Sequence, residues 1–285
     1  MACKGRHTPL WLKIQKEEIQ MRNLKRALSL ALAAIMLIGM MVVSASAVSY
    51  NDLTDKDQIV NKDAVSMLVS LGIIEGKPDG SYGPTENVDR AQMAKMLSVI
   101  MNKGVDNSAL YQSVNSGLTD ITSNWAKGHI NYCYTTGIIA GRGNGTFDPS
   151  ATVTALEAAK MLLVAVGYDP KIEGFEGADW AINVSVRADE QGIFEGFTKD
   201  LSAPLNRDDA ALLIYNALDV EMIQSYTTNN YPIVYSDHRT ILSDKYGVIK
   251  VEGVVTANEW AILDDDTDTA LQEGKTRIYN PDGIL

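Results

Sequence analysis

Two arginines stand at matching places in the chain, each directly after a residue that favours the start of a helix. Arg90 follows Asp89, and Arg207 follows Asn206. Asp and Asn are good helix N-caps, so both arginines are predicted at the first helical position. A helix N-terminus offers unpaired N–H groups and partial positive charge, and a guanidinium can clamp a carboxylate. We therefore predict two anion-binding sites; the alternative is a pair of surface arginines in weak ion pairs.

Two tryptophans also recur at a fixed spacing. Trp125 lies twelve residues before Gly137, and Trp180 lies twelve residues before Gly192. A tryptophan ring can offer a flat apolar face to a sugar, or it can serve packing alone. The sequence leaves both interpretations open for Trp125 and Trp180.

A third predicted helix start lacks the arginine. Thr154 is a good N-cap, but Ala155 stands where the other two segments have Arg90 and Arg207. We expect the anion site to be missing there. Arg142, in the preceding loop, is either its substitute or a solvated loop residue.

Residue patterns for catalysis or metal binding are weak. The chain has neither a His-Glu-x-x-His nor a Gly-x-Ser-x-Gly motif. The acidic segment 264–268 begins like a calcium loop, but Thr269 and Lys275 occupy the positions that need glycine and glutamate. We expect no enzyme activity, no cofactor and no metal site.

The elements that must position these side chains form an internal repeat. Segments 72–76 and 137–141 both read Gly-Ile-Ile-x-Gly, and segment 192–196 reads Gly-Ile-Phe-x-Gly. In the first two copies a turn and a proline follow, and the proline comes twelve residues after the first glycine. The third copy has a shorter loop. An amphipathic helix is predicted before each first glycine, with that glycine ending the helix in the left-handed conformation.

A second helix is predicted after each loop, starting at the caps Asp89, Thr154 and Asn206. Gln92 and Glu157 complete capping boxes in the first two copies, and the third is a weaker version. The apolar positions of these helices recur with helical spacing, which indicates a core rather than a cofactor site.

This helix–loop–helix unit, present three times, resembles the S-layer homology family. The matching pieces are Trp-Ala, Gly-Ile-Ile-x-Gly, the loop ending in aromatic-x-Pro, and the capped helix start; together they span about residues 50–220. The resemblance implies a mainly α fold with three repeats in a pseudo-threefold arrangement. It also implies that grooves between the repeats bind a secondary cell-wall polymer, which often carries a pyruvate ketal, and that Arg90, Arg207, Trp125 and Trp180 contact it.

The N-terminal segment predicts export. Residues 21–47 read as a signal peptide with a basic start, an apolar run and Ala45-Ser46-Ala47 as the cleavage site. Residues 1–20 fit no targeting pattern, and we expect them to be an untranslated leader or a misassigned start. Removing residues 1–47 leaves 18 basic and 34 acidic residues, a net charge of −16. Such a surface disfavours nucleic acid and anionic membrane as partners.

The C-terminal segment changes character. Residues 221–285 are predicted to be β-rich, with strands at 231–235, 246–251, 253–256 and 276–279, and they end as the front of a longer protein would. The expected divisions are repeats at 48–104, 115–168 and 173–220, followed by this β-rich segment. We predict a secreted protein at the cell wall or in a surface layer, with possible self-assembly. The alternative is the anchor of a larger hydrolase or adhesin.

Overall fold

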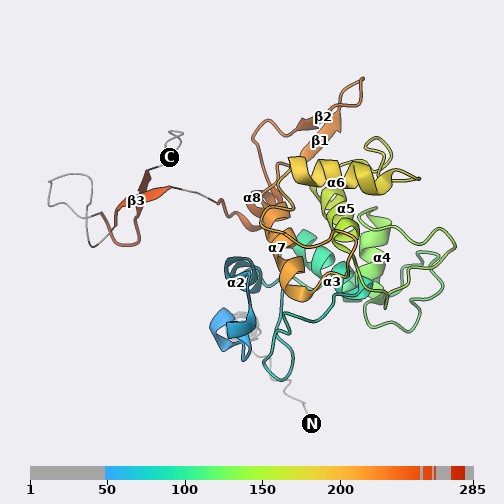
Figure 1. Ribbon diagram of the computed structural model, residues 1–285, viewed down its shortest axis with the longest axis horizontal. Coiled ribbons are helices and arrows are strands. Elements are labelled where there is room, and N and C mark those ends of the chain that lie inside the picture. Colours follow the sequence, from blue (N-terminus) through green and yellow to red (C-terminus); the bar gives the residue numbers. More distant parts are fainter. Residues whose placement is uncertain (1–48, 251–252, 259, 261–270, 280–285) are drawn as a thin grey trace, which may run out of the picture. The chain divides into compact units, whose positions relative to one another are not determined.

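The computed structural model describes residues 49–250, 253–258, 260 and 271–279 (Figure 1). This part of the chain is mainly helical and carries two small antiparallel sheets. The α-helices are α2 (Lys62–Ser70), α3 (Arg90–Met101), α4 (Lys127–Thr135), α5 (Ala155–Val166), α6 (Trp180–Glu190), α7 (Arg207–Leu218) and α8 (Ile241–Tyr246). Three 3-10 helices are η1 (Tyr50–Asp52), η2 (Lys56–Gln58) and η3 (Ser108–Tyr111). The predicted leader and signal peptide, and the acidic segment 264–268, lie outside the described residues.

Helices α2 to α7 form three consecutive pairs, α2/α3, α4/α5 and α6/α7. The first helix of each pair stops just before the predicted glycine, and Gly72, Gly137 and Gly192 have φ angles of 70°, 79° and 69°. Only glycine adopts this conformation without strain. The prediction that these glycines end their helices is confirmed.

The second helix of each pair begins at the predicted cap. Asp89 and Thr154 form complete capping boxes with Gln92 and Glu157. The Asn206 side chain accepts from the Asp209 N–H, without the reciprocal bond. The cap positions and the weaker third cap are therefore as predicted.

The three pairs are held together by packing between a helix of one pair and a helix of another. Helix α3 packs against α4, α5 packs against α6, and α7 packs against α2; α5 also contacts α3 and α7. Figure 1 shows α5 beside α7 and α6. Helix α7, late in the chain, is thereby a neighbour of α2.

Three backbone hydrogen bonds close a ring among the segments that lead into the second helices. The Val88 N–H donates to the Leu205 carbonyl at 2.8 Å, Leu205 donates to Val153 at 2.8 Å, and Val153 donates to Val88 at 2.9 Å. All three residues are buried. Each pair therefore donates to one pair and accepts from the other.

The C-terminal segment differs from its prediction in part. Strands β1 (Ile223–Tyr226) and β2 (Pro232–Val234) pair, as do β3 (Val254–Ala257) and β4 (Arg277–Tyr279). The strand predicted at 246–251 is wrong for the residues described there, since helix α8 ends at Tyr246 and residues 247–250 form no regular element. A capping box at Thr240 starts this helix, and buried Ile241 and Leu242 fix it to the core.

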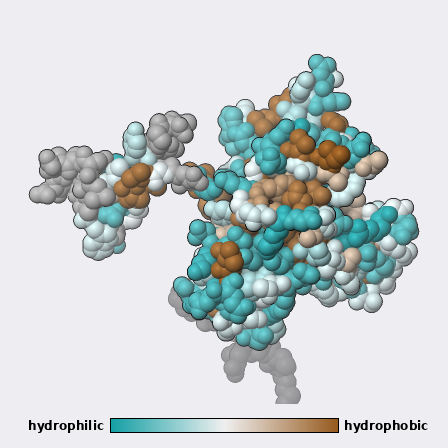
Figure 2. Space-filling view, viewed as in Figure 1, coloured by the Kyte–Doolittle hydropathy of each residue, from teal (hydrophilic) through white to brown (hydrophobic). Residues whose placement is uncertain are grey.

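The described surface is mostly polar. Figure 2 shows a largely hydrophilic face with small separate apolar patches, one of them over α6, where Ile182 and Val186 are exposed. None of the described helices is long and apolar enough to span a bilayer.

Candidate binding site

A cavity of about 560 Å³ lies between the loop that precedes α5, helix α5 and the start of α6. It brings together Arg90 and Trp180, two of the four predicted ligand-binding residues. Arg142, Glu157, Lys160 and Glu176 also line it, so basic, acidic and aromatic side chains share one space. A concave site of this size suits a small polar ligand or a sugar unit.

Arg90 lines the cavity and is almost fully buried, with 4% of its surface exposed. Its Nε donates to the Phe147 carbonyl at 2.8 Å, and Nη2 donates to the Ala140 carbonyl at 2.9 Å. Its guanidinium also lies 4.4 Å from the centre of the Phe147 ring. Burial and the nearby Arg142 lower the pKa of Arg90 to about 10. Arg90 therefore uses two of its hydrogen bonds to hold the loop that precedes α5.

The helix starts do not offer free amides, which corrects the sequence-based expectation. The Arg90 and Ala91 N–H groups donate to the carbonyls of Ala151 and Pro149, both at 2.9 Å. At α7, the Arg207 N–H donates to Glu86 O at 2.8 Å. The neighbouring pair supplies these acceptors, so an anion cannot bind there without displacing them. An anion site at the start of α3 or α7 must therefore be built from side chains.

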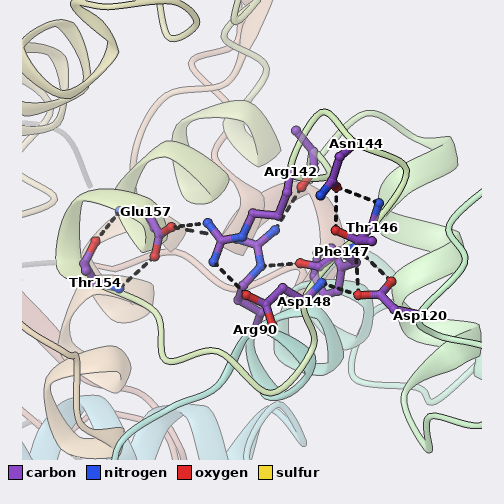
Figure 3. Close-up of polar contacts among 10 residues, drawn as sticks. Arg90, Asp120, Arg142, Asn144, Thr146, Phe147, Asp148, Thr154 and Glu157 are labelled. Atoms are coloured by element: carbon purple, nitrogen blue, oxygen red, sulfur yellow. Dashed lines mark hydrogen bonds and ion pairs between the residues drawn. The ribbon is translucent and has the colours of Figure 1, made fainter.

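The Arg142 and Arg90 side chains lie close together, and both point towards Glu157 (Figure 3). Its Nη1 donates to Glu157 Oε1 at 3.0 Å, and its Nη2 lies 3.7 Å from Asp148 Oδ2. The other Glu157 oxygen accepts from the Thr154 N–H at 3.1 Å in the capping box. Glu157 is thus fixed at one end by the helix and presents its other oxygen to two arginines, Arg90 lying 4.0 Å away. Arg142 is thus an exposed loop residue that also lines the cavity and is held by Glu157 and Asp148.

Lys160 and Trp180 also line the cavity and lie close to each other. The Lys160 ammonium lies 5.7 Å from the centre of the Trp180 ring, and Trp180 is half-buried. Burial lowers the pKa of Lys160, while Glu176 and Glu157 act in the opposite direction. An indole ring beside an ammonium offers both an apolar face and a donor to a sugar.

Two aspartates that hold the loops escaped the sequence analysis. Asp120 accepts from the Phe147 N–H at 2.9 Å and the Asp148 N–H at 2.7 Å, and Asp55 accepts equivalently from Tyr82 and Gly83, both at 2.7 Å. The signal was present in the sequence, because Leu-Thr-Asp occurs at 53–55 and at 118–120, at the same offset before the helix-ending glycine.

Arg207 and Trp125 lie outside this cavity. Arg207 is partly buried and donates from Nε to the Tyr82 carbonyl at 2.7 Å, with its guanidinium 4.8 Å from the Tyr82 ring centre. Arg207 thus holds the first loop as Arg90 holds the second. Trp125 is 58% exposed and contacts His129 edge to face, so it is not a core residue.

Ala155, the first residue of α5, stands where the other two helices have an arginine, and it is fully buried. An arginine there would have to displace packed neighbours, so the missing guanidinium reflects a filled position rather than an open groove. Among the described residues no group of three or more His, Cys, Asp or Glu is placed to hold a metal ion.

Comparison with known proteins gives a family match for two of the three helix pairs. Residues 49–94 and 117–159 match the S-layer homology domain. The chain is 27% identical over 268 residues to a cell surface protein of Thermoanaerobacter kivui, covering 93% of this chain and 32% of that protein. It is 34% identical over 113 residues to an S-layer protein of Bacillus licheniformis, covering 40% of this chain and 12% of that one.

Some relatives are named as enzymes. An exoglucanase of Acetivibrio thermocellus is 27% identical over 192 residues, which cover 62% of this chain and 17% of the enzyme. The chain spans about a third or less of the length of these curated relatives. Together the comparisons support anchoring at the cell wall.

Proposed function

We propose that the chain anchors a protein to the bacterial cell wall by binding an acidic wall polysaccharide without covalent chemistry. The observation that carries this proposal is the cavity beside α5 and α6, placed within and next to segments that match the S-layer homology domain. Relatives named as S-layer and cell surface proteins support the same function.

The cavity's side chains suit an acidic sugar. Arg142 and Lys160 both line it, and both keep part of their surface exposed. A carboxylate on the sugar, such as a pyruvate ketal, would compete with Glu157 for the Arg142 guanidinium. The Trp180 ring would cover an apolar face of the sugar.

We also propose that α6/α7 is a third, divergent repeat of the same kind. In the ring of hydrogen bonds through Val88, Val153 and Leu205, each helix pair donates one bond and accepts one. This equivalence supports a pseudo-threefold arrangement. In this scheme Arg90 and Arg207 do not touch the ligand. They hold the loops that shape the grooves. Residues 21–47 would direct secretion, with residues 48–104, 115–168 and 173–220 forming the repeats.

A second candidate is an anchor module within a larger secreted hydrolase. The match to an exoglucanase favours it, because this chain aligns with only 17% of that enzyme. In that case the wall-binding site is the same, and catalysis belongs to another part of the protein.

Pull-down on cell-wall sacculi tests the proposal, using the full chain before and after the wall polymer is chemically stripped. We expect binding that is lost on stripped sacculi and weakened by Lys160→Gln, with Lys62→Gln as the matched control on the exposed face of α2. Equal retention on stripped sacculi would show that the polymer is not the ligand.

A further inference from the structure

A second cavity of about 550 Å³ adjoins the first. The two share six lining residues: Ile138, Ala140, Gly141, Gly143, Lys160 and Glu176. They are therefore neighbouring parts of one hollow that continues along the loop before α5. Each part alone lies within the range of about 300–1,000 Å³ typical of small-molecule sites.

The two parts differ in chemistry. The first adds Arg90, Arg142 and Glu157 to the shared residues, whereas the second adds no charged side chain of its own. The second is lined instead by uncharged groups, among them Tyr134, Val164 and Pro170, all partly exposed. An anionic group is favoured in the first part, and a neutral, partly apolar group in the second.

One positively charged and one negatively charged side chain lie at the boundary between the two parts. Lys160 projects from α5, and Glu176 from the segment before α6, and each lines both cavities. An ammonium donates and a carboxylate accepts hydrogen bonds, which matches the hydroxyl and bridging oxygens where two sugars join. Lys160 also faces Trp180 of the first cavity.

The loop beneath this boundary is held in shape. The Arg142 N–H donates to the Thr146 carbonyl at 2.8 Å, and Asp120 and Arg90 fix Phe147 just beyond it. A Cβ atom on Gly141 would lie 2.8 Å from the Thr146 carbonyl oxygen, so this close approach requires glycine. The hollow is thus preformed, which reduces the entropy that ligand binding must overcome.

We infer that this site has two subsites and takes at least two consecutive sugars, the acidic one beside Arg142 and a neutral one against Tyr134. The inference rests on the proposed function and refines it. The ligand is then an extended acidic oligosaccharide rather than a single terminal acidic sugar, and affinity depends on the neutral neighbour.

Calorimetric titration of the full chain with two probes tests the inference. The first probe is the methyl glycoside of a hexosamine carrying a pyruvate ketal, and the second is the same sugar extended by one neutral hexose. We expect the extended probe to bind about tenfold more tightly. Tyr134→Ala, which removes a wall, and Val164→Trp, which fills the second cavity, should each reduce this advantage to less than about threefold. Binding of the short probe should not change.

Tyr231→Ala is the matched control, because Tyr231 is an exposed tyrosine that lines neither cavity. Equal affinity for the two probes would overturn the inference, as would variants that weaken both probes alike while remaining folded by thermal unfolding. Binding of neither probe would contradict the proposed function itself, and the inference would fall with it.

Discussion

Replacing Arg90 by alanine tests whether this arginine is a structural clamp. The change deletes two charge-assisted hydrogen bonds and leaves the Phe147 and Ala140 carbonyls without their guanidinium partner. A hydrogen bond to a charged group contributes about 1.5–3 kcal/mol, and water can reach Ala140, an exposed residue. We therefore expect the free energy of unfolding to fall by about 3 kcal/mol.

Arg207→Ala is the internal comparison. Arg207 is less buried and donates one hydrogen bond to a carbonyl, so its loss should cost about 1–2 kcal/mol. Arg90→Lys should fall between wild type and Arg90→Ala, because one ammonium cannot reproduce the planar fork that reaches both carbonyls. Urea unfolding followed by circular dichroism measures all three.

The reasoning is refuted if Arg90→Ala and Arg207→Ala destabilise the protein equally within about 0.5 kcal/mol, the usual spread for surface changes. It is also refuted if Arg90→Ala remains fully stable and loses only ligand affinity. That second result would return Arg90 to the exposed, ligand-contacting role that its position after a helix cap first suggested.

Two further predictions concern pH. Burial raises the pKa of Asp120, but the Phe147 and Asp148 N–H groups outweigh this and hold it below its ordinary value. Asp120→Asn should therefore cost about 1.5–3 kcal/mol at pH 7 and lose that effect as acid protonates the wild type, measured by urea unfolding from pH 7 to 3. Burial lowers the pKa of His129 below 6.5 despite Asp106, so the unfolded chain binds the proton more readily and stability falls as pH drops below about 6.5. His129→Gln should remove that decline, and an unchanged pH profile of the melting temperature would contradict it.

The sequence predicts the helix pairs well because their signals are local. The glycines that end α2, α4 and α6, and the caps that start α3, α5 and α7, need only their own neighbours to act. The sequence predicts no element at residues 241–245, and the strand predicted at 246–251 shares only Tyr246 with α8. Burial of Ile241 and Leu242 against the distant helices α3 and α7 supports α8, and no local pattern reveals those contacts.

The candidate site was only half predictable for a related reason. Arg90 and Trp180 could be picked by type and spacing, but their meeting with Arg142 and Lys160 depends on how the pairs pack. Nor could the sequence show that the Ala151 and Pro149 carbonyls accept hydrogen bonds from the amides at the start of α3. Those acceptors come from a different repeat, so no local pattern reveals them.

The ring through Val88, Val153 and Leu205 also imposes an order on folding. Until residue 205 has been made, the Val88 N–H lacks its acceptor and α2 lacks its partner α7. A chain that stops after the second pair keeps apolar faces of α2 and α5 open to water. Closure joins segments far apart in the sequence, so it is slower than packing of adjacent helices. The first pair to be synthesised therefore completes its packing only after the last pair has been made. An incomplete chain is less stable and prone to associate through those exposed apolar faces.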